Sequence, residues 1–353
     1  MGEAFVAMAD DVSALHYNPA GLAFSPGGFS DLAGPSAGAR PIEMMVSHSL
    51  HIQDIQLSQM GVLYRPFGFS ATYLNMGGIE RRTSETAQAE GTFGASDMAV
   101  GMSYGRKVGE FGVGGTLKVI RETIGEYSAS AYAVDFGVLK RLENRPITLG
   151  AGLVNVGTQI KFVDQAYPLP MALRLGASYG MTPRFPHAIS LQVDFPRDNS
   201  PELRLGFEYA GFGPFALRAG YKTVGSAQKS AALGSALGSS APGIAEFYGF
   251  FMGVGFKTKL GSMDYTIMPY GELGNSHRFS LSLRFGGARG DRGLSRGSAA
   301  SEGGGAAAGA GAPAGAGAGA AALAERGSME AASPAPSPAP AHCIKRRRVI
   351  HGL

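Results

Sequence analysis

Apolar residues alternate with small or polar ones along most of the chain, and this period of two most constrains the fold. Neighbouring side chains on a β-strand point to opposite faces, so the alternation predicts strands with one apolar face each. The last segment shows the pattern: Phe279, Leu281, Leu283 and Phe285 alternate with Arg278, Ser280, Ser282 and Arg284. We count about fourteen such segments. Most have roughly the 9–11 residues that a tilted membrane strand needs.

The connections between these segments differ in length in a regular way. Those after even-numbered strands are short, as at 108–110 and 143–146, whereas several after odd-numbered strands are longer, notably 79–94, 161–170 and 224–246. Short turns on one side and longer loops on the other are typical of outer-membrane barrels. We therefore predict an all-β fold, a 14-stranded antiparallel transmembrane β-barrel over residues 43–286.

Composition agrees with a membrane barrel. Charged residues make up 16% of the 353 residues and glycine accounts for 54 of them, whereas soluble domains have about 25% charged residues. The chain has no apolar run near the ~20 residues of a transmembrane helix. These observations exclude a helical membrane protein and disfavour an ordinary soluble domain.

The alternation also predicts which face meets lipid. Because an arginine at mid-depth in a bilayer costs roughly 2–4 kcal/mol, the apolar row must face lipid and the charged row the lumen. The predicted lumen-facing charges are Asp135, Arg174, Asp194, Arg204, Glu208, Arg218 and Arg284. They have both signs, so we expect them to pair across the interior. Glycines on the same face leave room for a plug or a ligand: Gly101, Gly150, Gly152, Gly176, Gly206, Gly220 and Gly253.

The first 23 residues lack this alternation and predict a small folded unit. Asp10 and Asp11 can cap a short helix over 12–17, because carboxylates accept hydrogen bonds from the free N–H groups of a first turn. Pro19 disfavours the helical region at Asn18 and ends that helix, and Gly21 permits a tight change of direction. A connector rich in glycine, proline and serine then leads to residue 42.

Ala9-Asp10-Asp11, followed by Asn18-Pro19-Ala20-Gly21, resembles the FadL family of outer-membrane transport proteins, with the closest similarity to its PorV- and PorQ-type members. The resemblance implies that residues 1–42 form an N-terminal hatch and its connector, plugging the barrel. It implies roles in shaping or anchoring the hatch and in gating a ligand for Asp10, Asp11, Asn18, Pro19, Ala20 and Gly21.

The function implied by the resemblance is passive transport of hydrophobic small molecules, such as fatty acids, across the bacterial outer membrane. The ligand would be captured from outside and released laterally into the bilayer when the hatch shifts. The alternative is a structural or adaptor barrel in protein secretion, because PorV- and PorQ-type relatives handle secreted proteins in the type IX system. The expected partners are therefore outer-membrane lipid, a hydrophobic ligand and, under the alternative, a secretion-system protein.

Motifs for catalysis and cofactors are weak. The seven histidines do not cluster at metal-ligand spacings and Cys343 is the only cysteine, so we predict no metal, no cofactor and no enzyme. A hydrolase is hinted at only by Ser47 with His48 and by Ser276 with His277, on strands that adjoin when the barrel closes.

The ends of the chain differ from the body. Residues 287–353 hold eight of the 31 lysines and arginines and four of the 27 acids, which leaves the body balanced, so we predict no nucleic-acid partner. The Gly/Ala and Pro/Ala/Ser composition of 287–353 predicts a disordered tail. Residues 1–23 lack the basic and apolar regions of a signal peptide, so we expect export to require such a segment ahead of Met1.

Overall fold

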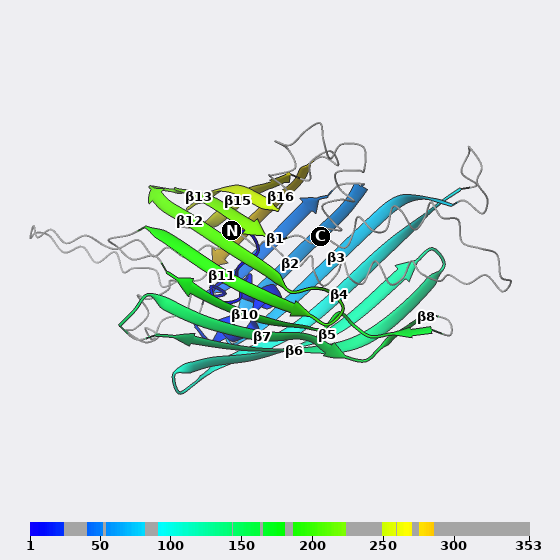
Figure 1. The fold of residues 1–353 in the computed structure, drawn as a ribbon, viewed down its shortest axis with the longest axis horizontal. Coiled ribbons are helices and arrows are strands. Elements are labelled where there is room, and N and C mark those ends of the chain that lie inside the picture. The colour runs from blue at the N-terminus through cyan, green and yellow to red at the C-terminus, as the bar shows by residue number, and fades with distance from the viewer. Residues whose placement is uncertain are drawn as a thin grey trace, which may run out of the picture.

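A computed structural model describes residues 1–24, 41–51, 54–81, 91–142, 144–162, 165–180, 186–223, 249–258, 260–269 and 275–285. Fourteen strands form a closed antiparallel barrel (Figure 1), which confirms the predicted fold. Most of the predicted connector (25–40) and the predicted tail (287–353) lie outside the described residues.

The wall follows chain order with one interruption. Its strands are β1 (Ile42–Leu50), β2 (Ile55–Tyr64), β3 (Phe67–Arg81), β4 (Gly91–Val108), β5 (Phe111–Ile124), β6 (Tyr127–Arg141), β7 (Ile147–Gly157), β10 (Ala172–Tyr179), β11 (His187–Pro196), β12 (Glu202–Phe212), β13 (Phe215–Lys222), β14 (Phe250–Lys257), β15 (Gly261–Pro269) and β16 (Asn275–Phe285). A small hairpin, β8 (Ile160–Phe162) and β9 (Gln165–Tyr167), interrupts this order between β7 and β10. β1 closes the barrel against β16, from Ile42 opposite Phe285 to Leu50 opposite His277.

Two predicted loops are partly strand. β3 continues to Arg81 and pairs with β4 from Gly91, so residues 79–81 and 91–94 of this predicted loop belong to the barrel wall. Ladder hydrogen bonds use only the backbone, so polar side chains do not end a strand. The predicted loop 161–170 contains most of the β8–β9 hairpin. The predicted seventh strand, 147–160, ends at Gly157, after Asn155 adopts a left-handed φ of 58° and the pairing with β6 shifts.

The outer surface of the barrel is apolar. In β16, Phe279 is 54% exposed whereas the neighbouring Arg278 is 8% exposed, and the same alternation runs along the other strands. Aromatic rings pair near both ends, as Phe215 with Phe256 and Tyr221 with Phe250. A closed barrel leaves no unpaired edge in the hydrocarbon, and an apolar belt with aromatic girdles suits a bilayer. The chain is thus a bacterial outer-membrane barrel.

The two ends of the barrel are not alike. The strands begin at Ile42 and finish at Phe285 on the same side, where the turns 65–66, 109–110 and 213–214 are also found; we call this the plug end and the opposite one the far end. β3 to β6 have 14–18 residues each, whereas β10 to β16 have 8–11. The longer strands project beyond the others on one side of the barrel (Figure 1). No helix in the described part of the chain is long and apolar enough to cross a membrane.

Candidate functional site

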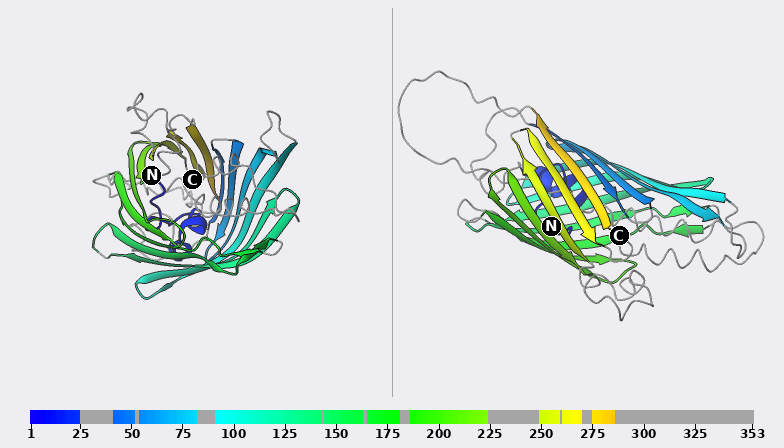
Figure 2. Two further views of the ribbon diagram at one scale, coloured as in Figure 1. Left: turned by 45° about the vertical axis from the view of Figure 1, so that its right-hand side comes forward. Right: turned by 90° about the horizontal axis from the view of Figure 1, so that it is seen from above.

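Residues 1–24 form a plug inside the barrel. They contain one α-helical turn, α1 (Ala14–Tyr17), and a 3-10 helix, η1 (Pro19–Ala23). Most of their side chains are buried, and Figure 2 shows this blue segment enclosed by the strands. The barrel interior is therefore occupied on the plug side by the segment whose sequence resembled a hatch.

The helix in the plug is shorter than predicted. It begins at Ala14 and not at Val12, and no side chain caps it. Asp11 Oδ1 instead accepts from the Ser13 backbone N–H at 2.9 Å, while Asp10 Oδ2 lies 3.4 Å from Nη2 of Arg141. The turn does end at Tyr17, because Asn18 is extended with φ −158° and ψ 104° before Pro19.

Asn18 connects the plug to the wall. Its Nδ2 donates to the carbonyl of Val6 at 2.9 Å and, at 3.3 Å, to the carbonyls of Val138 and Ala151 on β6 and β7. Its Oδ1 accepts from the Ala20 N–H at 3.1 Å and so caps η1. The fully buried amide thus joins two parts of the plug and two strands of the wall.

Pro19 and Ala20 pack directly on strand backbone. A Cβ added at Gly114 would lie 2.3 Å from the Pro19 carbonyl, and one at Gly137 would lie 1.9 Å from Asn18 Oδ1. No side chain fits at such distances, so glycine is required at both places. Gly21 acts similarly and not through its turning freedom, since its added Cβ would lie 2.1 Å from the Ala9 carbonyl.

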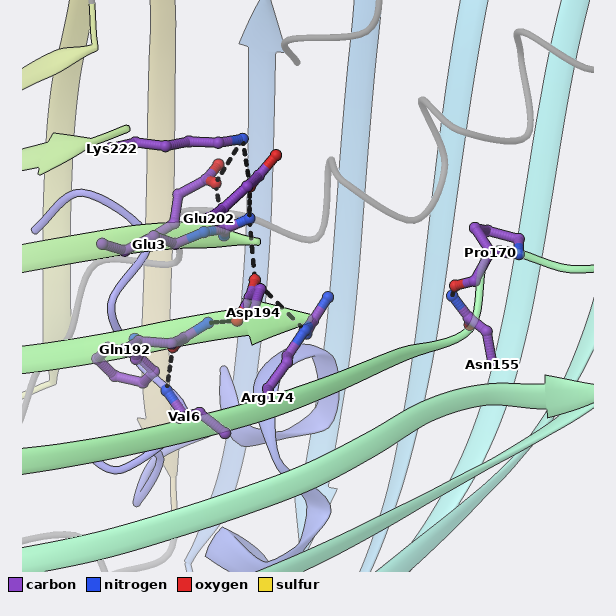
Figure 3. A network of polar contacts seen from close by, with 11 residues as sticks. Glu3, Val6, Asn155, Pro170, Arg174, Gln192, Asp194, Glu202 and Lys222 are labelled. Atoms are coloured by element: carbon purple, nitrogen blue, oxygen red, sulfur yellow. Dashed lines mark hydrogen bonds and ion pairs between the residues drawn. The ribbon is translucent and has the colours of Figure 1, made fainter. Parts of the chain in front are cut away.

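An ion-pair network holds the start of the plug (Figure 3). Glu3 Oε2 lies 2.7 Å from Arg204 Nη1, and Arg204 Nη2 lies 3.0 Å from Asp194 and 2.9 Å from Glu202. Lys222 reaches Glu202 at 3.2 Å. Burial alone would raise the pKa of Glu3, but Arg204 and Lys222 outweigh it and hold the pKa at about 2. Glu3 is therefore an anion in this site.

Gln192 extends this network to the plug backbone. Its Oε1 accepts from the N–H groups of Phe5 and Val6 at 2.9 Å each, and its Nε2 donates to Asp194 at 2.7 Å. Arg174 lies 3.9 Å from the same carboxylate. These contacts join residues nearly 190 positions apart in the chain.

The remaining predicted lumen charges fall in three places. Arg218 is buried between Glu208 and Asp264, and Lys257 lies 3.2 Å from Glu208. Asp135 is buried near the β6–β7 shift, where it lies 2.8 Å from Lys118 and accepts from the Asn155 N–H at 2.7 Å. Arg284 is on the inward side of β16 but is exposed at the plug end.

A second clamp holds the end of the plug. Nε of Arg65 donates to the Phe24 carbonyl at 2.7 Å and its Nη2 to the Asp10 carbonyl at 2.6 Å, and the same guanidinium pairs with Glu43. Burial and the nearby Asp10 carboxylate raise the pKa of Asp11 to about 7. The plug is thus fixed at both of its ends by buried charge.

The serine–histidine pairs suggested by the sequence are not pairs in the structure. Ser47 faces the lumen and its Oγ lies 3.0 Å from that of Ser280, whereas His48 faces outward to Ser58. Ser276 contacts His51 at 2.9 Å, and His277 contacts the Tyr265 hydroxyl at 2.8 Å. Neighbours on a strand point to opposite faces, so neither predicted pair could form. Among the described residues no group of three or more histidine, cysteine, aspartate or glutamate side chains could hold a metal.

An apolar cluster inside the far end was missed by the sequence reasoning. This apolar lumen cluster combines inward side chains of β2 to β6 with residues of the segment that bears β8 and β9: Ile55, Leu57, Leu74, Met76, Ala95, Ile120, Ile124, Ala129, Ala131, Ala133, Ile160, Phe162 and Leu169. The available signal was a local loss of alternation, as in Tyr73-Leu74 and Val119-Ile120. There both faces of the strand are apolar.

Several solved structures have a fold similar to that of this chain. The toluene transporter TbuX of Ralstonia pickettii is 11% identical, with a TM-score of 0.49 over 80% of this chain and 97% of that one. The toluene transporter TodX of Pseudomonas putida is 11% identical, with a TM-score of 0.47 over 80% of this chain and 96% of that one. The outer membrane protein Omp33 of Acinetobacter baumannii is 9% identical, with a TM-score of 0.41 over 70% of this chain and 98% of that one.

These structures are similar to the chain as barrels, at very low sequence identity. The function that each name states is that of the named protein. No protein-family model matches the chain, and no curated protein matches it. The comparisons give no support to a closer similarity to PorV- or PorQ-type members.

Proposed function

We propose that this barrel carries small hydrophobic molecules passively across the outer membrane. The observation that carries the proposal is the contrast along the interior, because a charged, anchored plug occupies the plug end and an apolar lumen cluster lines the far end. The plug blocks a straight route for polar solutes, whereas the cluster suits an apolar one. Each Å² of apolar ligand surface removed from water contributes about 25 cal/mol.

The plug contacts opposite parts of the wall, which supports its blocking role. A Cβ at Gly150 would lie 2.6 Å from the Val6 carbonyl, and one at Gly206 would lie 2.5 Å from the Met1 carbonyl. Pro19 packs in the same way on β5, at Gly114. We infer that Asp10, Asp11, Asn18, Pro19, Ala20 and Gly21 act indirectly, by keeping the plug seated so that the straight route through the barrel stays closed.

We infer that the ligand leaves the barrel sideways, into the bilayer, through the wall between β6 and β7. Pairing there starts only at Ala133 opposite Gly157 and shifts between Val134 and Phe136. The far-end part of β6, residues 127–131, has no β7 partner among the described residues, and β8 lies beside it. A ligand leaving the apolar lumen cluster here would not have to displace the plug. Fatty acids remain a prediction as the ligand, made from the sequence resemblance.

The test compares uptake of a labelled hydrocarbon and of a sugar of similar size, in cells that lack their own hydrophobic-compound channels. We expect the protein to raise hydrocarbon uptake several-fold and to leave sugar uptake unchanged. Ile120→Ser makes the cluster polar and should remove most of the gain. Leu117→Ser on the same strand is a matched control, because Leu117 is 66% exposed on the outer face.

Equal uptake of both probes, or hydrocarbon uptake no greater than in cells with an empty vector, would contradict transport. The alternative from the sequence, an adaptor barrel with a secretion-system partner, would remain a prediction in that event. It would then be tested by co-purification of a partner from the native outer membrane.

A further inference from the structure

Two acidic side chains lie side by side within the apolar lumen cluster. Strand register places Leu57, Leu74, Asp97, Glu122 and Ala129 at one level across β2 to β6, each opposite the next. All five are buried, Asp97 at 3% exposure and Glu122 at 0%. The adjacent residues on these strands, Met98 and Arg121, are exposed on the outer face, so both carboxyl groups belong to the inner face.

The levels on either side of this row are mostly apolar. Ile55, Met76, Ala95 and Ile124 are aligned nearer the far end, and Ala99, Ile120 and Ala131 are aligned nearer the plug. Gln59 and Thr72 complete the second level. Ile160 and Phe162 of β8 belong to the same cluster. Asp97 is thus surrounded mainly by apolar side chains of the cluster.

Asp97 differs from the other carboxylates of the lumen. Its Oδ2 is buried and has no hydrogen-bond partner in the described part of the chain. Asp135, Asp194 and Glu208 each have a lysine or arginine within reach. Lys118, two inward positions along β5 from Glu122, is already bound to Asp135 at 2.8 Å. A buried acceptor without a partner is destabilising, and more so when it is charged.

We propose that Asp97 receives the head group of a hydrophobic amine whose apolar body occupies the cluster. The inference rests on the proposed function and names its ligand class. An ammonium group supplies the donors that Asp97 Oδ2 lacks, and charge-assisted hydrogen bonds are about twice as strong as neutral ones. A fatty-acid carboxylate in the same pose would face Asp97 and Glu122, and like charges at close range repel.

The experiment compares four ligands with one carbon skeleton: octylamine, octanol, octane and octanoate. Equilibrium dialysis against the protein in lipid nanodiscs, with empty nanodiscs subtracted, gives saturable binding for each. We expect octylamine to bind roughly tenfold more tightly than octane, and octanoate to bind more weakly than octane. A tenfold difference corresponds to about 1.4 kcal/mol, which is within reach of one hydrogen bond to a charged group. Octanol should fall between octylamine and octane.

The variant Asp97→Asn keeps the size of the side chain and removes its charge. It should lose the tenfold preference for octylamine while octane binding is unchanged. Glu110→Gln is the matched control, because Glu110 is an acid in the exposed 109–110 turn that pairs with Lys140 at 2.9 Å. Heat-modifiable gel migration establishes that both variants are folded.

Octanoate binding as tightly as octylamine would overturn the inference, and so would a preference for octylamine that survives in Asp97→Asn. In either case saturable octane binding would leave the proposed function standing. If none of the four ligands binds to the folded protein, both the proposed function and the ligand class fail.

Discussion

The wall formed by β10–β16 and the wall formed by β2–β6 have equally apolar outer faces, but their inner faces differ in polarity. Both present apolar side chains to lipid. Inside, the first carries charges that pair with one another or with the plug, namely Arg174, Asp194, Arg204, Glu208, Arg218, Lys222 and Asp264. The second is apolar at its far end, with Asp97 and Glu122 as exceptions. The bilayer requires apolar side chains on the outer face of every strand, whereas the side chains on the inner face depend on what packs against them.

Removing Arg204 should disturb the charged wall most. Arg204→Ala leaves the buried Glu3 and Asp194 and the half-buried Glu202 without their shared cation. Breaking a buried ion pair by removing one partner costs about 3–5 kcal/mol. We expect the plug to leave its seat and to become sensitive to protease, with a lower thermal unfolding temperature. Octane binding at the apolar wall should change far less.

Arg197→Ala is the control, because Arg197 is exposed in the turn after β11. Equal losses in the two variants would mean that arginine content, and not the Glu3 network, controls plug seating. A protected plug in Arg204→Ala would show that the charged wall does not hold it.

Adding one methyl group to β5 tests the contact between wall and plug without changing charge. Gly114→Ala places a Cβ 2.3 Å from the Pro19 backbone, which cannot yield as a side chain could. Overpacking of this kind costs about 1–3 kcal/mol. We expect faster hydrogen exchange in residues 14–23, read by mass spectrometry.

The neighbouring Gly115→Ala adds the same methyl group on the other face, where the nearest atom is 3.5 Å away. It should leave the plug unchanged. If both substitutions loosen the plug equally, the effect comes from strand propensity and not from the close approach to Pro19.

The smallest effect we expect is a dependence of plug seating on pH. The pKa of Asp11 rises from 3.8 to about 7 in the folded protein, so its contribution is complete below pH 4 and is lost as pH rises through 7. Glu3 acts oppositely, since its pKa falls from 4.5 to about 2 and its contribution is lost as pH drops through that range. Protection of the plug should therefore be greatest near pH 4.5, decline as pH rises to 7, and level off above that.

Asp11→Asn should flatten the decline between pH 4 and 7, because asparagine does not titrate and still accepts from the Ser13 N–H. Proteolysis of residues 1–24 across this range gives the measurement. An unchanged slope in Asp11→Asn would assign the dependence to another group, such as Asp10, whose pKa is also raised by burial.

The barrel could be predicted from the sequence because lipid imposes one rule on every strand. Phe279 and Arg278 must take opposite faces wherever the strand lies in the wall. The plug contacts could not be predicted, since they join distant residues such as Phe5 and Gln192. The unpaired state of Asp97 could not be predicted either. Its alternation with Met98 places the carboxyl group on the inner face, but the pattern does not show whether a lysine or arginine lies beside it. The helix start at Ala14 was missed because Asp11 bonds locally to Ser13.

The pairing of β1 with β16 has a consequence for how the molecule assembles. Every other neighbouring pair in the wall joins strands that are consecutive in the chain order of the wall. The β1–β16 pair instead joins its first and last strands, with Ile42 opposite Phe285. Bringing ends that far apart together costs about 5 kcal/mol of chain entropy by the logarithmic rule for loops. Until β1 pairs with β16, the wall does not enclose residues 1–24. We therefore expect pairing of β1 with β16 and enclosure of residues 1–24 to be coupled steps in assembly.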